Sequence, residues 1–165
     1  RTLMINSFSK TFAMTGWRIG YICSPNNEAM SQIIKMQYYI TACSNDAMQY
    51  AVLTAFDEAS TYPEEMAKEF QSRRDLICSR LNSMPGVSCH IPKGAFYVFP
   101  KVEVPGLNSQ ELAIELLKGG VLSSPGSAFG ESGEGHLRFA YTVSREDISL
   151  GMDKVESVLK RLRGD

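Results

Sequence analysis

The stretch of sequence that decides the interpretation of this chain is SFSKTFAMTGWRIG, at residues 7–20. It overlaps an apolar, β-compatible run at residues 2–8, which predicts a strand with Lys10 just beyond its end. Three aromatic side chains flank the lysine: Phe8, Phe12 and Trp17. We expect these rings to remove the lysine partly from water. A desolvated amine favours its neutral form, which is the nucleophilic one.

Groups suited to a phosphate lie close to the same lysine in sequence. Hydroxyl donors come from Ser7, Ser9 and Thr11. Arg18 stands between two glycines and offers a planar fork of N–H donors, which suits a phosphate dianion. An exposed lysine and a salt-bridged arginine on an ordinary surface loop would explain each residue taken alone. The combination at this spacing favours a ligand site.

This segment resembles the cofactor-lysine signature of the class I/II aminotransferases, the aspartate aminotransferase family of fold type I. That signature is a serine, any residue, a small residue and the lysine, followed at this spacing by glycine-x-arginine-x-glycine. The resemblance implies that Lys10 is the catalytic residue and forms a Schiff base with pyridoxal 5'-phosphate. It also implies that Ser7 and Arg18 hold the cofactor phosphate, with help from Ser9.

A second segment that carries an arginine is LRFAYT, at residues 137–142. We expect a strand here, with its apolar residues on one face and Arg138 on the other. An arginine on an exposed strand edge would be solvated, whereas one inside an apolar strand needs an anionic partner. Together with the preceding SPGSAFG at residues 124–130, the segment is similar to the family's substrate-carboxylate segment. The resemblance implies that Arg138 binds the substrate α-carboxylate as a bidentate pair.

Two further segments match the family less specifically. KGAFYVFP, at residues 93–100, resembles a small-domain segment near the substrate, but we expect Phe96 and Tyr97 to be core aromatics. Asn45 weakly matches a region that approaches the active site of the partner subunit. Neither segment is included in the expected site.

The order of predicted elements indicates an α+β fold of the α/β family. We expect residues 1–62 to be the tail of the large cofactor-binding domain, and residues 63–165 to be the C-terminal small domain. In the first part, a strand at 19–23 precedes two helices, the second of them capped by Ser44. The expected elements of the second part are a helix at 64–82, strands at 87–91 and 95–99 joined in a hairpin, a helix capped by Ser109, a strand at 121–123, a glycine-rich loop at 126–135, a strand at 137–142 and a helix capped by Ser144.

Composition and charge argue against several classes of protein. The 165 residues are 44% hydrophobic and 21% charged, which is typical of a globular protein with a core. A net charge of −1 gives no attraction to nucleic acid or to an anionic membrane, and no apolar run reaches the ~18 residues of a membrane-spanning helix. The four scattered cysteines predict a reducing, cytoplasmic location, and with only two histidines no metal site is expected.

The start of the chain bears on its activity. The first residue is Arg1 rather than Met, and a strand begins almost at once, so we expect the chain to begin inside a longer protein. The resemblance implies that the family's phosphate-binding glycine loop, stacking aromatic residue and pyridinium-binding aspartate lie upstream. It also implies a homodimer that acts on an L-amino acid and a 2-oxo acid. We expect the truncated chain alone to be inactive.

Three alternatives to an aminotransferase stay open at this point. Related pyridoxal-phosphate enzymes that eliminate sulfur groups or close cyclopropane rings share the same residues. A non-catalytic phosphate- or nucleotide-binding module is less favoured, because the loop at 126–135 has neither a G-K-[ST] ending nor a G-x-G-x-x-G motif. The third alternative is an inactive scaffold.

Overall fold

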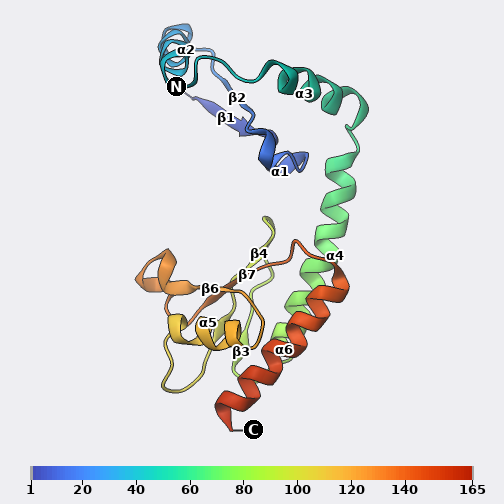
Figure 1. Ribbon diagram of the computed structural model, residues 1–165, viewed down its shortest axis with the longest axis vertical. Coiled ribbons are helices and arrows are strands. Elements are labelled where there is room, and N and C mark those ends of the chain that lie inside the picture. Colours follow the sequence, from blue (N-terminus) through green and yellow to red (C-terminus); the bar gives the residue numbers. More distant parts are fainter. Residues whose placement is uncertain (1, 165) are drawn as a thin grey trace. The chain divides into compact units, whose positions relative to one another are not determined.

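The computed structural model describes residues 2–164, and the chain divides into two compact units, Arg1–Met66 and Ala67–Asp165 (Figure 1). Helices and strands occur in both units, which confirms the predicted α+β class. Among the helices of residues 2–164, none is long and apolar enough to span a membrane.

The first unit is organised around a two-stranded antiparallel pair, β1 and β2, whose register sets Ser7 opposite Gly20. The pairing requires glycine at this point, because a Cβ on Gly20 would lie 2.5 Å from the carbonyl oxygen of Asn6. The elements of this unit, with the helix that leaves it, are β1 (Met4–Ser7), α1 (Phe8–Thr11), the 3-10 helix η1 (Thr15–Trp17), β2 (Gly20–Cys23), α2 (Asn27–Thr41), α3 (Asp46–Glu58) and α4 (Tyr62–Asn82).

A small apolar cluster packs α1 against α3. Phe8 is buried, and its ring centroid lies 5.4 Å from that of Phe56 and 5.7 Å from that of Tyr21. The cap of α3 differs from the prediction. The Asn45 side chain accepts the Met48 N–H at 3.3 Å, so the expectation that Ser44 caps this helix is wrong by one residue. An asparagine carbonyl serves this position as well as a serine hydroxyl does.

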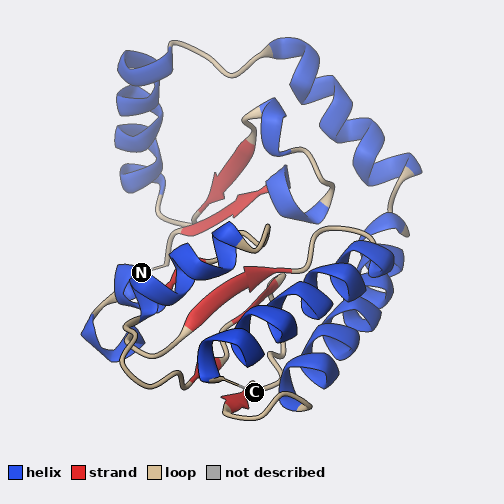
Figure 2. Ribbon diagram, turned by 60° about the horizontal axis from the view of Figure 1, so that its bottom comes forward, coloured by secondary structure: helices blue, strands red, loops and turns tan. Residues whose placement is uncertain are grey.

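The second unit contains a three-stranded antiparallel sheet in the order β4-β7-β6 and a separate antiparallel pair, β3 and β5. Figure 2 shows its strands in red with helices beside them. Its elements after α4 are β3 (Val87–Ser88), β4 (Tyr97–Val98), β5 (Lys101–Val102), α5 (Ser109–Lys118), β6 (Ser124–Pro125), η2 (Gly126–Phe129), η3 (Glu131–Gly133), β7 (Leu137–Ala140) and α6 (Arg145–Arg163).

Helices α4 and α6 run side by side in the same direction. Arg145 at the start of α6 pairs with Glu69, and Arg80 near the end of α4 pairs with Asp153 at 2.6 Å. One apolar core fills the space between α4, α5, α6 and the sheet. Its most deeply buried side chains include Ile77, Leu81, Leu116, Leu137, Tyr141 and Leu159.

The predicted hairpin of strands 87–91 and 95–99 is wrong. Val87 pairs with Val102 and Tyr97 with Ala140, so the two segments pair elsewhere. A side chain of α4 takes the place of a strand partner: Asn82 accepts the Cys89 N–H at 2.8 Å and donates to the Cys89 carbonyl at 3.0 Å. The N–H and the carbonyl of Cys89 are thereby both satisfied.

Two further predictions around α5 are wrong. Asn108, not Ser109, caps this helix, because its side chain accepts the Glu111 N–H at 2.9 Å while the Glu111 carboxylate accepts the Asn108 N–H at 3.0 Å. No strand forms at 121–123, since the Val121 N–H bonds back to the Leu116 carbonyl at 2.9 Å. The prediction that Ser144 caps α6 is confirmed.

Two of the four cysteines form a buried pair. Cys78 and Cys89 are 1% and 7% exposed, and their sulfurs lie 3.9 Å apart. Burial, with Cys78 adding to it, raises the pKa of the Cys89 thiol to about 12, so the reactive thiolate is scarce at neutral pH.

We therefore expect a thiol reagent at pH 8 to leave Cys78 and Cys89 unmodified in the native protein and to modify both after unfolding. Cys23 and Cys43, which are exposed within the described residues, serve as the comparison. Peptide mapping after timed alkylation measures each site. Modification of Cys89 as fast as Cys23 in folded protein would contradict the burial of the pair.

Candidate active site

Lys10 lies in the last turn of α1, a four-residue helix that follows β1 directly. Ser7 caps this helix: its Oγ accepts the Ser9 N–H at 3.1 Å and donates to the Ser9 Oγ at 2.9 Å. The two hydroxyls that the sequence predicted as phosphate ligands are therefore adjacent, at the start of the turn that carries the lysine.

The predicted desolvation of Lys10 does not occur within the first unit, where its side chain is exposed. The reason lies in the neighbouring rings. Phe8 and Phe12 turn to the apolar cluster and contact Phe56, at 5.4 and 6.0 Å between centroids, while Trp17 is 47% exposed. Phe8 and Phe12 therefore pack the turn onto α3, and none of the three rings covers the lysine.

Arg18 is tied to the same turn through Thr15. The Arg18 Nη1 donates to the Thr15 carbonyl at 3.0 Å, and the Thr15 Oγ1 donates to the Ser9 carbonyl at 2.9 Å. The backbone of Arg18 is left-handed, with φ 54° and ψ 52°, a conformation that costs a non-glycine residue about 1–3 kcal/mol and is concentrated at functional sites. Among the ion pairs of residues 2–164, none includes Arg18.

Arg138 lies in the second unit, on β7, the central strand of the sheet. The predicted alternation is confirmed: Leu137 and Phe139 are 1% and 4% exposed, while Arg138 on the other face is half-buried. Its Nη2 donates to the Ser124 Oγ at 3.3 Å. No carboxylate of the described residues forms an ion pair with this guanidinium.

Two aromatic rings flank Arg138, and both are absent from the predicted site. The Arg138 Cζ lies 4.4 Å from the ring centroid of Tyr97 and 4.6 Å from that of Phe129. The expectation that Tyr97 is only a core aromatic is wrong, because its ring is half-buried against the guanidinium. Its position follows from pairing that is distant in sequence: β4 pairs with β7 and places Tyr97 opposite Ala140.

Phe129 comes from the predicted glycine-rich loop, residues 126–135, which folds as two 3-10 turns, η2 and η3. The loop closes through two glycines. A Cβ added to Gly126 would lie 1.9 Å from the Gly133 carbonyl oxygen, and one added to Gly133 would lie 2.1 Å from the Gly126 carbonyl oxygen. Only residues without a side chain permit this approach.

We expect Gly126→Ala to lower the free energy of unfolding of the second unit by about 3 kcal/mol, because an overpacked backbone contact must be opened. Gly94→Ala is the matched control, since a Cβ at Gly94 meets nothing within 4 Å, and its effect should stay below about 0.5 kcal/mol. Urea unfolding of the full-length protein compares the two variants. Equal stabilities would show that the loop opens without cost.

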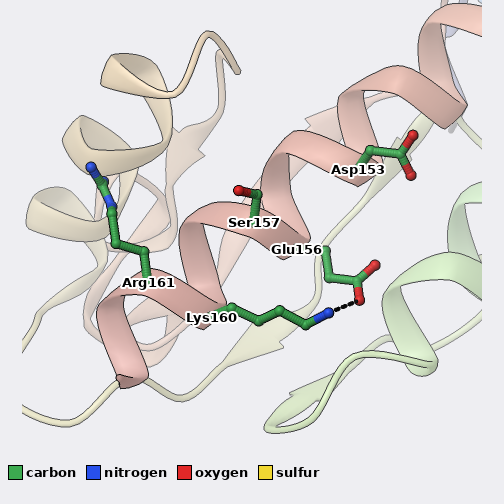
Figure 3. Close-up of a pocket in the computed structure, with 5 residues that line it drawn as sticks. All are labelled: Asp153, Glu156, Ser157, Lys160 and Arg161. Atoms are coloured by element: carbon green, nitrogen blue, oxygen red, sulfur yellow. Dashed lines mark ion pairs between the residues drawn. The ribbon is translucent and has the colours of Figure 1, made fainter. Parts of the chain in front are cut away.

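The open hollow on the outer face of α6 is not a competing site. Figure 3 shows its lining residues on one helix, with Lys160 directed at Glu156, an ion pair of 2.7 Å. The Lys160 ammonium, and more weakly Arg80, lowers the pKa of Glu156. Arg161 pairs with Glu115 at 3.0 Å. The charges around this hollow thus have partners within the protein. Nor does any cluster of His, Cys, Asp and Glu among residues 2–164 suit a metal ion.

Comparison with known proteins identifies the family. The profile described as "Aminotransferase class I and II" matches residues 1–155. The chain belongs to this family. It is 42% identical over 163 residues to an aspartate aminotransferase of Pyrococcus abyssi, and 41% identical over 163 residues to aromatic-amino-acid aminotransferase 2 of Thermococcus litoralis.

Solved aminotransferase structures have the same fold. The aromatic aminotransferase of Pyrococcus horikoshii superposes with a TM-score of 0.90 at 43% identity, over 98% of this chain and 43% of that one. The aspartate aminotransferase of Rhizobium meliloti superposes with a TM-score of 0.89 at 32% identity. The chain spans about 41% of the length of the curated aminotransferases it matches, which confirms that it corresponds to part of the family fold.

Proposed function

We propose that the full-length protein transfers an amino group between an L-amino acid and a 2-oxo acid, with pyridoxal 5'-phosphate attached to Lys10. The observation that carries the proposal is the turn after β1. There the Lys10 helix begins with two hydroxyls in contact, Ser7 and Ser9, and Arg18 is linked to it by hydrogen bonds, within a chain of the aminotransferase family.

The chemistry of this donor set fits the cofactor. Two serine hydroxyls and a guanidinium without a carboxylate partner among the described residues are suited to a phosphate monoester. The exposed Lys10 amine on the same short helix is suited to an aldehyde. Ser7, Ser9 and Arg18 would therefore hold the phosphate, and Lys10 would make the covalent attachment.

Lys10 and Arg138 have different roles in the proposed reaction. When bound, pyridoxal phosphate supplies an electron-withdrawing ring that stabilises negative charge at the substrate α-carbon. The Lys10 Nζ, freed when the substrate amine displaces it, acts as the general base that removes the proton from that carbon and holds it for return. Arg138 holds the substrate carboxylate with parallel N–H donors, and this anchor helps to orient the bond that breaks.

The proposal extends to the surroundings of the site. Residues 1–62 are assigned to the large cofactor-binding domain and residues 63–165 to the small domain, and the enzyme is a cytoplasmic homodimer. The resemblance to the aminotransferase family supports these assignments. The named relatives include aspartate and aromatic-amino-acid aminotransferases, so amino acids of both classes are the first substrates to assay.

The test is an absorbance spectrum of the full-length protein with pyridoxal phosphate, before and after borohydride. We expect a band in the visible or near ultraviolet that borohydride changes, and a reduced pyridoxyl group on the peptide that contains Lys10. Amino acid must also be converted to 2-oxo acid. A folded protein with no band would contradict the proposal and favour the scaffold. A band with elimination in place of transamination would favour a related enzyme.

A further inference from the structure

The surroundings of Arg138 contain a second layer of interactions centred on Glu134. The Glu134 Oε1 accepts the backbone N–H of Ser109 at 2.6 Å and that of Gly135 at 3.0 Å, and its Oε2 accepts the Ser109 hydroxyl at 2.9 Å. Ser109 is the first residue of α5 and is 2% exposed. One carboxylate therefore fastens the 126–135 loop to the start of a helix.

The 126–135 loop contacts Arg138 through Phe129. The Ser109 hydroxyl also contacts Ser127, accepting its backbone N–H at 3.3 Å, so the loop is attached to α5 on both sides of η3. Phe129 lies between these two attachment points, and its ring contacts the Arg138 guanidinium. The position of that ring consequently depends on Glu134, although Glu134 itself has no contact with Arg138 among the described interactions.

The two rings restrict how the guanidinium is approached. Tyr97 and Phe129 each lie within 4.6 Å of the Arg138 Cζ, and no ring contact joins them to each other among residues 2–164. Each ring therefore restricts how the guanidinium can turn. A planar carboxylate that approaches the guanidinium edge-on makes two parallel hydrogen bonds.

We propose that Tyr97, Phe129 and Glu134 are positioning residues for the substrate carboxylate. The contacts of Tyr97 and Phe129 restrict the orientation of the Arg138 guanidinium, and Glu134 fixes the loop that carries Phe129. This inference rests on the proposed function, since it gives Arg138 the substrate as its partner. The Glu134 side chain stays charged at neutral pH, because the N–H groups of Ser109 and Gly135, followed by the Ser109 hydroxyl, lower its pKa. The hydrogen bonds that fasten the loop to α5 are lost only as the pH falls through that lowered pKa.

The test uses the full-length enzyme with bound cofactor and compares two reactions. One is the spectral half-reaction with an amino acid, which needs the carboxylate site. The other is the reaction with hydroxylamine, which attacks the cofactor without a carboxylate. For Phe129→Leu and Tyr97→Leu we expect the KM for the amino acid to rise about 3- to 30-fold, with kcat and the hydroxylamine rate within about 2-fold of the wild type. Phe129→Tyr, which keeps an aromatic face, should restore most of the affinity.

Glu134→Gln tests the attachment itself. We expect a rise in KM of about 3- to 10-fold, because the amide presents one acceptor oxygen where the carboxylate presents two. Glu131→Gln is the matched control in the same loop, since none of the described side-chain hydrogen bonds or ion pairs involves Glu131. Thermal unfolding of each variant shows whether the fold is retained.

The outcomes separate the two proposals. If the wild type gives neither a cofactor band nor a reaction with amino acids, the proposed function fails and this inference falls with it. If the wild type reacts and the variants keep its KM, only the positioning role fails. A parallel loss toward amino acid and hydroxylamine would overturn it as well, because it would show a general structural defect.

Discussion

Replacing Lys10 with alanine is expected to lower the turnover of the full-length enzyme by at least about 10⁴-fold. The proposed mechanism assigns this one amine both the covalent attachment of the cofactor and the proton transfer at the substrate α-carbon. A positioned general base alone contributes about 10²–10⁴-fold, and the loss of attachment adds to it. Single-turnover absorbance measurements with excess amino acid follow the proton transfer directly.

The structure indicates that Lys10→Ala should fold normally. The Lys10 side chain is exposed, and the capping bonds of its helix come from Ser7 and Ser9. Lys35→Ala, at an exposed lysine of α2, is the matched control and should keep wild-type turnover. A Lys10→Ala enzyme that retains more than a hundredth of the wild-type rate would refute the proposed role of this lysine.

Replacing Arg138 is expected to have the second largest effect, on substrate binding. Arg138→Gln removes the charge and the fork of donors, and truncating one partner of a hydrogen-bonded charge pair costs about 2–5 kcal/mol, or about 30- to 5,000-fold in kcat/KM. Arg138→Lys keeps the charge but cannot make two parallel bonds, so we expect an intermediate loss. Steady-state kinetics at saturating 2-oxo acid measure kcat/KM for both variants.

The control for Arg138 is Arg161→Gln. Arg161 is an exposed arginine of α6 whose partner is Glu115, and a solvent-exposed pair of this kind contributes little to stability. We expect its kcat/KM to equal that of the wild type. Cofactor attachment should survive in the Arg138 variants, because Lys10, Ser7 and Arg18 are unchanged. A kcat/KM for Arg138→Gln within 3-fold of the wild type would exclude this arginine as the carboxylate anchor.

Much of the fold was predictable because its signals are local in sequence. Lys10 follows a strand as predicted, and the alternation of apolar residues in β7 correctly separated Arg138 from the core. The long helix predicted at 64–82 is α4, at Tyr62–Asn82, and the start of α6 after Ser144 was also predicted. Each of these features depends on the residue types within one turn or one strand.

The errors arose where pairing is distant in sequence. The strands around Pro92 looked like a hairpin, but their partners are β5 and β7. Tyr97 and Phe129 reach Arg138 only through the sheet register and the closed loop, so nothing adjacent to the arginine in sequence indicates them. The exposure of Lys10 was missed for a similar reason, because the rings beside it pack against α3.

The alternation of β7 has a consequence for engineering. Successive residues of this strand serve different purposes: Leu137 and Phe139 fill the core, while Arg138 between them faces the other way, toward Tyr97 and Phe129. A core substitution that shifts the strand by a few tenths of an ångström therefore also re-aims the guanidinium. Selection of Leu137 and Phe139 variants for thermal stability would therefore also change substrate affinity. Libraries at these two positions should be screened for both properties.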